Sequence, residues 1–193
     1  MARFHFLVRL AVAGVCGCLT MFHLPAAAAE TFHVDPVHSS MLFRVKHMNT
    51  SYIWGRFNEY SGTANLDGAD PSFSVQIKVD SIDTANAKRD QHLKGPDFFS
   101  ARQFPAISFK STKVTKLGPT TYDVEGTLTL HGVSKPIKVR VDRTGTGKGP
   151  TGGAITGLAT TFTIKRSDFG MKFMLQGVGD DVLIVANLEC AAR

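Results

Sequence analysis

Cysteine is scarce in this sequence. Only three of the 193 residues are cysteines, and Cys16 and Cys18 lie in the apolar N-terminal segment. If that segment is removed, Cys190 alone remains, which excludes an internal disulfide and a cysteine-based metal cluster in the mature chain. A lone cysteine can be a nucleophile, but it is more often a small buried apolar side chain.

Long apolar runs are also missing, apart from residues 10–24, which fall short of the ~20 residues of a membrane-spanning helix. Two arginines precede this run, and the alanines at 27–29 supply small residues for cleavage. We therefore predict that residues 1–29 are a cleavable signal peptide and that residues 30–193 form one domain that is exported from the cytoplasm. A lipid anchor on Cys16 is the less favoured alternative.

The charge has no dense run of either sign. Without Arg3 and Arg9, the remaining chain holds 20 Lys and Arg against 16 Asp and Glu, a mild and scattered excess. Binders of nucleic acid show dense basic stretches interleaved with aromatic residues, so this class is excluded. An anionic ligand or a membrane surface would still be attracted.

Motifs for catalysis or metal binding are absent as well. Residues 145–149 (GTGKG) are rich in glycine, but they lack the further glycine and the Ser or Thr that a phosphate-binding P-loop requires. The sequence has no His-x-x-x-His pair and no Gly-x-Ser-x-Gly elbow. We therefore predict a protein that is not an enzyme and needs neither metal nor cofactor.

Strict alternation of apolar and polar residues is abundant. It marks eight strands, one of which is expected to run from Trp54 to Leu66. One apolar and one polar face per strand is typical of an antiparallel sheet with one side in water. Eight such strands can close into an up-and-down barrel, while a two-sheet sandwich fits the alternation equally well.

One connection, residues 88–99, departs from this alternation and predicts a short helical lid, with Asp97 as a helix cap. Small residues at or near inward positions favour a cavity, although glycine also marks strand bends; they are Ala64, Gly126, Gly157, Ala159 and Ala186. The expected cavity lining is apolar and consists of Phe43, Val45, Phe57, Ile77, Val79, Leu93, Phe98, Phe99, Ile107, Phe109, Leu128, Leu130, Phe162, Phe169, Met174 and Ile184.

Three polar residues are candidates for holding a ligand headgroup: His47, Arg89 and His92. Arg89 and His92 are three positions apart and would share one side of a helix. The favoured alternative for Arg89 is an ion pair with Asp90, Asp97 or Asp168 that fixes the lid. For His47 it is a hydrogen bond within the core.

Four stretches, in this order, resemble the YceI family: HSSMLFRVKH (38–47), KRDQHLKGPDFF (88–99), GTLTLHGVSKP (126–136) and RSDFGM (166–171). The resemblance covers residues 31–190 and implies an all-β, eight-stranded antiparallel, lipocalin-like barrel, which decides against the sandwich. It further implies a periplasmic protein that binds polyisoprenoid lipids.

We therefore expect a carrier or sequestering protein, with a link to stress, that holds a long-chain polyisoprenoid or similar amphiphile and makes transient membrane contact. A homodimer through exposed apolar residues is also allowed. Three alternatives remain open: an enzyme acting on the bound lipid through His47 or His92, a quinone-dependent redox accessory, and a module that works through its outer surface.

Overall fold

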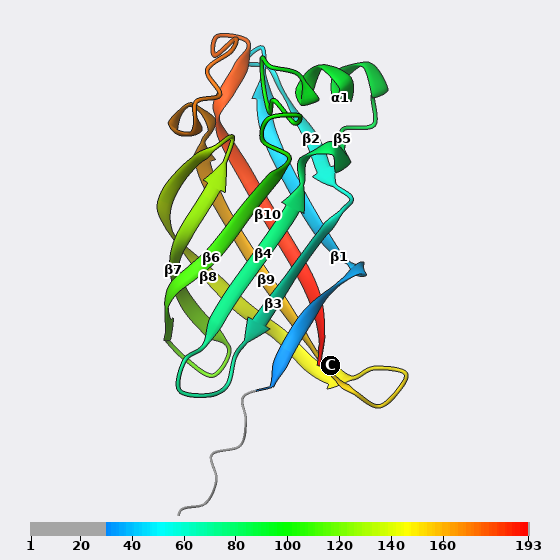
Figure 1. Ribbon diagram of the computed structural model, residues 1–193, viewed down its shortest axis with the longest axis vertical. Helices are drawn as coiled ribbons and strands as arrows, with labels where there is room; N and C mark the ends of the chain where they lie inside the picture. The colour runs from blue at the N-terminus through cyan, green and yellow to red at the C-terminus, as the bar shows by residue number, and fades with distance from the viewer. Residues whose placement is uncertain (1–29, 193) are drawn as a thin grey trace, which may run out of the picture.

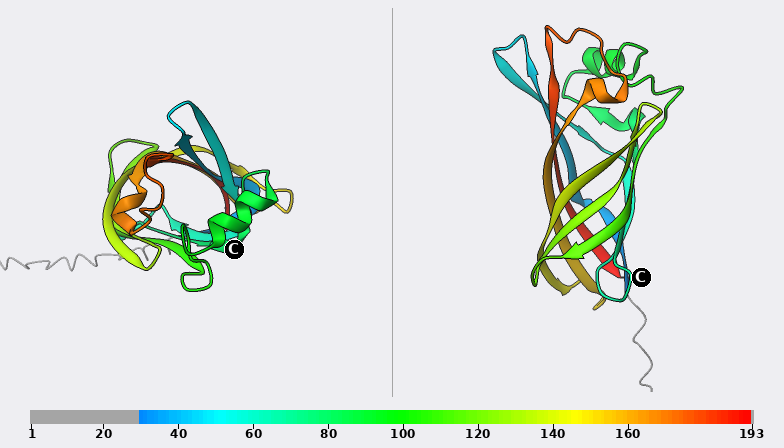
Figure 2. Two further views of the ribbon diagram at one scale, coloured as in Figure 1. Left: turned by 90° about the horizontal axis from the view of Figure 1, so that it is seen from above. Right: turned by 90° about the vertical axis from the view of Figure 1, so that its left-hand side faces the viewer.

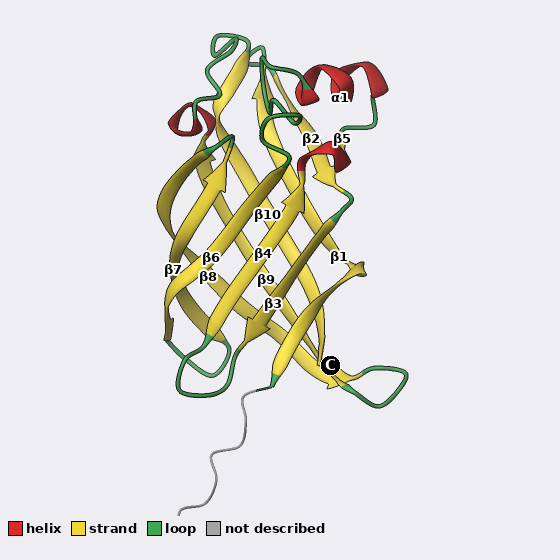
Figure 3. Ribbon diagram, viewed as in Figure 1, coloured by secondary structure: helices red, strands yellow, loops and turns green. Residues whose placement is uncertain are grey.

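The computed structural model describes residues 30–192, which form a closed antiparallel barrel (Figure 1). The predicted signal peptide, residues 1–29, lies outside the described residues. The strands are β1 (Thr31–His47), β2 (Ser51–Phe57), β3 (Tyr60–Asn65), β4 (Ser72–Lys78), β5 (Ile82–Asp83), β6 (Ala106–Lys116), β7 (Thr121–Leu130), β8 (Val133–Lys148), β9 (Ala154–Lys165) and β10 (Val178–Ala192). The helical elements are α1 (Ala87–Lys94) and two 3-10 turns, η1 (Val79–Ser81) and η2 (Arg166–Phe169) (Figure 3).

The barrel has eight strand positions, as predicted. β2 and β3 occupy one position because both pair with β1, and the two-residue β5 pairs only with β2. The pairing of β10 with β1 closes the wall, which removes the exposed sheet edges that would otherwise invite aggregation. The single strand expected from Trp54 to Leu66 is therefore wrong: it is divided by a turn at Asn58 and Glu59.

This division is matched by a bulge in β1, where the register with β10 shifts between Asp35 and Ser40. Pro36 has no N–H to donate to the ladder, and an Asp35 carboxylate oxygen accepts the N–H of Val37 at 2.9 Å. The inward face of β1 consequently changes from even to odd residue numbers, from Phe32 and Val34 to Met41 and Phe43.

The alternation of the other strands places their apolar residues inside, and β7 is buried at every second position. On β9 the buried residues are Thr156 and Leu158, so Gly157 and Ala159 lie at the alternate positions. Ala159 nevertheless lines an interior cavity, whereas Gly157 lines none, so the expectation that Gly157 helps to hollow out the interior is wrong.

The two ends of the barrel differ. Toward the lower end of Figure 1, Tyr122 and Cys190 are fully buried, and the Phe73 and Tyr122 rings are in edge contact at 6.2 Å between centroids. The upper end carries α1, η2 and the loops that follow them (Figure 2). An entering ligand therefore has one end available, the upper one.

The lid is only lightly attached. Asn86, not Asp97, caps α1: its side chain accepts the Arg89 N–H at 3.0 Å, and the helix ends at Gly95. α1 itself has no buried residue, whereas Phe98 in the turn after it is buried. Within residues 30–192, no helix is both long and apolar enough to cross a bilayer.

Candidate functional site: an apolar cavity in two compartments

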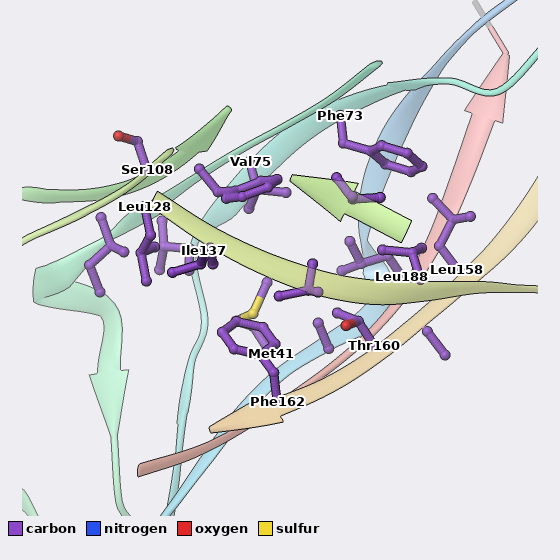
Figure 4. Close-up of a pocket in the computed structure, with 18 residues that line it drawn as sticks. Met41, Phe73, Val75, Ser108, Leu128, Ile137, Leu158, Thr160, Phe162 and Leu188 are labelled. Atoms are coloured by element: carbon purple, nitrogen blue, oxygen red, sulfur yellow. The ribbon is translucent and has the colours of Figure 1, made fainter. Parts of the chain in front are cut away.

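The barrel interior holds two apolar cavities, each of about 120 Å³. A lower cavity lies between the strand walls (Figure 4), and an upper cavity lies beneath the lid. The two share one set of lining residues, Met41, Ile77, Ile107, Leu128 and Phe162. Because these side chains separate the compartments, their rotation would join the compartments into a single tunnel.

Each compartment has room for only a short piece of hydrocarbon. Its volume is close to that of an engineered apolar cavity of ~150 Å³ that stays dry and binds benzene. Each compartment therefore accommodates about five carbon atoms, and the two in line about ten. A longer chain would have to leave its remainder at the mouth.

The lining offers almost nothing polar to a ligand. Ser108, Thr160 and Arg166 are its polar residues. The Thr160 hydroxyl donates to the Arg140 carbonyl at 2.7 Å, and Figure 4 shows the Ser108 hydroxyl at the edge, directed away from the other side chains. Neither cavity is lined by a histidine, cysteine or carboxylate of the described chain.

Arg166 is the charged residue of the upper lining, and it is 3 % exposed. Its guanidinium donates three hydrogen bonds to backbone carbonyls, at 2.9 Å to Met171 in the following loop and at 2.7 Å to Val178 and 3.0 Å to Gly179 at the start of β10. Burial lowers the pKa of this guanidinium, although arginine stays protonated in proteins. Arg166 therefore holds the loop in place and presents its carbon stem to the cavity.

Thirteen of the sixteen residues predicted to line the cavity do line one or both compartments. Val79 is buried in η1, where its N–H donates to the Pro105 carbonyl, and Phe169 is buried in η2. Met174 is 48 % exposed on the loop before β10. The thirteen are Phe43, Val45, Phe57, Ile77, Leu93, Phe98, Phe99, Ile107, Phe109, Leu128, Leu130, Phe162 and Ile184.

None of the three candidate headgroup residues lines either compartment. The Arg89 guanidinium donates to the hydroxyl and carbonyl oxygens of Thr84, at 2.7 and 2.6 Å, so it fixes the lid without the predicted ion pairs. His92 hydrogen-bonds to Asp97 at 2.9 Å and stacks edge-on against Phe98, at the mouth. His47 lies at the end of β1, opposite Ser51.

Sequence reasoning left many lining residues out, although the same alternation could have found most of them. Arg166 is the instructive case, because Phe162 and Ile164 are inward and the period of two leads directly to it. The others include Met41, Leu42, Phe73, Val75, Val124, Ile137, Val139, Val141, Leu158, Ile164, Met171, Val178, Val182 and Leu188.

Gly126 is inward, as expected, but it does not leave a hollow. The ring of Phe109 lies over it, so closely that a Cβ atom at position 126 would be 2.5 Å from that ring. The absence of a side chain thus makes room for a neighbouring aromatic ring. Of the five small residues predicted at or near inward positions, Ala159 and Ala186 border the lower cavity.

Titratable groups gather elsewhere, on the outer wall at the β1 bulge. His38 hydrogen-bonds to Asp35 at 2.8 Å, which raises the pKa of His38 and lowers that of Asp35. The Glu189 carboxylate is 3.8 Å from the same imidazole. These exposed groups belong to the bulge and do not border the cavity.

The chain matches a family model described as a YceI-like domain over residues 32–190. A UPF0312 protein of Pseudomonas paraeruginosa is 34 % identical over 174 residues, covering 88 % of this chain and 91 % of that protein. A UPF0312 protein of Yersinia pestis is 35 % identical over 174 residues, covering 88 % of this chain and 90 % of that protein.

Solved structures share the fold. The Campylobacter jejuni YceI protein is 33 % identical with a TM-score of 0.70, covering 77 % of this chain and 90 % of that one. Burkholderia cenocepacia BcnA is 25 % identical with a TM-score of 0.73, covering 81 % of this chain and 98 % of that one. A polyisoprenoid binding domain from Saccharophagus degradans has a TM-score of 0.66 at 18 % identity, covering 84 % and 98 %.

Proposed function

The chain belongs to the YceI-like domain family, and we propose that it binds the hydrocarbon tail of a polyisoprenoid or similar amphiphile in its barrel. The observation that carries this proposal is the lining: two apolar compartments in line, closed below and covered by a light lid. The polyisoprenoid-binding description of the Saccharophagus degradans domain supports the same ligand class.

The headgroup would remain at the mouth. Thr160 and Arg166 donate their polar hydrogens to backbone carbonyls, and the Ser108 hydroxyl points away from the cavity, so a buried hydroxyl or phosphate would find no partner inside. An unpartnered polar group costs several kcal/mol to bury. The tail therefore enters first, and His92, next to Phe98, is the predicted residue nearest to a headgroup.

We further propose that binding involves no chemical step and no cofactor. A general acid or base has to reach the reacting atom within hydrogen-bond distance, and neither His47 nor His92 borders a compartment. The predicted signal peptide supports a role as a carrier or reservoir in the periplasm, with a link to stress. Quinones share the isoprenoid tail and belong to the same ligand class.

A tail-length series tests this function. Each methylene group that enters should strengthen binding about fourfold, and the gain should stop after about ten carbons, when both compartments are full. The gain per methylene group should be the same for an alcohol, an acid and a phosphate with the same tail, because the headgroup stays outside the compartments. A protein that is free of extractable lipid when isolated from its own source, and that takes up none of these probes, would contradict the proposal.

A further inference from the structure

Most of the large apolar side chains that the described residues expose lie at the upper end, around the mouth of the barrel. They sit on two segments, the β1–β2 hairpin and the loop between η2 and β10, and each is 40–54 % exposed. We call this set the mouth patch: Met48, Tyr52, Trp54, Phe173, Met174 and Leu175.

The two segments are joined. The Met48 N–H donates to the Gly177 carbonyl at 2.6 Å. Both Met48 and Met174 lie against Gly177, where a Cβ atom would be 3.1 Å from one side chain and 2.5 Å from the other. Figure 2 shows the hairpin and the loop rising together at the end that carries the lid.

The mouth patch is continuous with the cavity. The Phe173 ring packs edge-on against Phe98, with 5.4 Å between centroids, and Phe98 lines the upper compartment. An apolar path therefore runs from the exposed surface to the interior. A tail that leaves the cavity would meet this path before it meets water.

On the hairpin, an arginine lies between two aromatic rings. The Arg44 guanidinium is 4.2 Å from the centre of the Tyr52 ring and 5.6 Å from that of Trp54. Trp and Tyr are enriched where proteins cross the membrane–water interface, and arginine can keep its charge at that level while its stem stays apolar.

The charge of the molecule is concentrated at the same end. The segments at the upper end, residues 44–56, 79–103 and 165–181, hold ten Lys and Arg against seven Asp. Residues 30–192 as a whole hold 19 Lys and Arg against 16 Asp and Glu. The mouth therefore carries a net charge of +3 and the rest of the barrel none, which would attract an anionic surface and repel the mouth of a second copy.

We propose that the mouth patch docks onto a lipid bilayer that contains anionic lipids, so that a tail passes between the bilayer and the upper compartment along Phe98. This inference rests on the proposed function, because docking would serve to exchange the tail that the barrel binds. It adds the surface through which this exchange would take place. The occupant is the bilayer itself, because it supplies both the apolar layer that matches the mouth patch and the negative charge that matches its surroundings.

Vesicle flotation tests the docking. The protein should float with vesicles of phosphatidylcholine and phosphatidylglycerol and not with vesicles of phosphatidylcholine alone. Trp54→Ser combined with Leu175→Ser should reduce binding roughly tenfold. The matched control, Val37→Ser combined with Leu117→Ser, removes apolar side chains that are more exposed but lie away from the mouth, and should bind like the wild type.

Charge reversal gives a second comparison. Lys46→Glu combined with Lys172→Glu should weaken binding to the anionic vesicles by on the order of tenfold or more. Lys113→Glu combined with Lys148→Glu makes the same change in net charge elsewhere and should have a much smaller effect.

Three results would overturn the docking proposal: no flotation of the wild type, equal losses in variants and controls, or a wild-type dimer that Trp54→Ser converts to a monomer. Uptake of a geranylgeraniol probe tests the proposed function separately from docking, and every variant should retain the probe. If the probe is retained and flotation is absent, docking fails alone. If flotation persists and the wild type does not take up the probe, the proposed function fails alone.

Discussion

Ala186→Leu should weaken ligand binding while it stabilises the empty protein. Ala186 is buried, lies on β10 between Met41 of β1 and Thr160 of β9, and borders the lower cavity. Its side chain is small where the strand faces an empty space of about 120 Å³. The three added carbons of leucine would enter this space without displacing a neighbour.

The expected changes in stability and in ligand affinity both follow from the apolar contacts of the three added carbons. Three buried carbons are worth about 2.4 kcal/mol at ~0.8 kcal/mol each, and rotamer loss and imperfect packing leave a net gain of about 1 kcal/mol in the free energy of unfolding. A tail excluded from the same volume loses the full amount, which corresponds to roughly fiftyfold weaker binding.

Urea unfolding of the ligand-free protein and titration with a fluorescent isoprenoid probe would measure the two quantities. Asn187→Leu is the matched control, because its side chain is exposed on the outer face of the same strand. Unchanged affinity in a stabilised Ala186→Leu protein would show that tails do not reach the lower compartment. A loss of stability of more than about 2 kcal/mol would show that the space cannot hold a larger side chain.

Three further predictions concern buried residues of the barrel. Gly126→Ala should lower the free energy of unfolding by about 1–3 kcal/mol in a thermal unfolding assay, because the new methyl group would meet a ring and a backbone carbonyl. The control is Gly118→Ala, where nothing lies within 4 Å, and its free energy of unfolding should stay within about 0.5 kcal/mol of the wild-type value. Arg166→Met removes three donors from backbone carbonyls and should cost on the order of 3 kcal/mol in denaturant unfolding, with a wild-type value refuting this role. Burial raises the pKa of the Cys190 thiol from 9.0 to about 11, so the unfolded chain ionises first and stability falls as the pH rises from 9 to 11. Stability curves should show the wild type losing up to about 2.5 kcal/mol more than Cys190→Ala over that range.

The barrel could be predicted because its information is local. The inward residues of β7, from Tyr122 to Leu130, follow a strict period of two, and a one-residue error would turn every apolar side chain toward water. Closure into a barrel could not be predicted from the alternation alone. Alternation also fits a sandwich, and the resemblance of four motifs to one family was needed to decide.

The errors come from places where tertiary contacts override the local pattern. The break at Asn58 and Glu59 accompanies the β1 bulge, which depends on how Asp35 and Pro36 meet a strand distant in sequence. Asn86 rather than Asp97 caps α1, because the helix begins one residue after Asn86 and Asp97 is held by His92. Both carboxylate and amide are good caps, so composition alone could not choose.

The interior was predicted better than the mouth for a similar reason. Inward positions on strands are fixed by alternation, whereas Met174 and Arg166 lie where the strand pattern ends. Arg166 continues the inward face of β9 and is buried among carbonyls, while Met174 turns outward at a positive φ of 52°. A loop has no period from which burial can be read.

The architecture leaves one route for a ligand. The wall is hydrogen-bonded around its circumference, and the lower end is filled by fully buried side chains such as Tyr122. The upper end is covered by α1, which buries no residue, and by the loop that Arg166 secures. Elements with few buried contacts open at the lowest free energy. The end that opens most easily is therefore the end where the charge is positive and the apolar side chains are exposed, so ligand entry and surface recognition fall on the same residues.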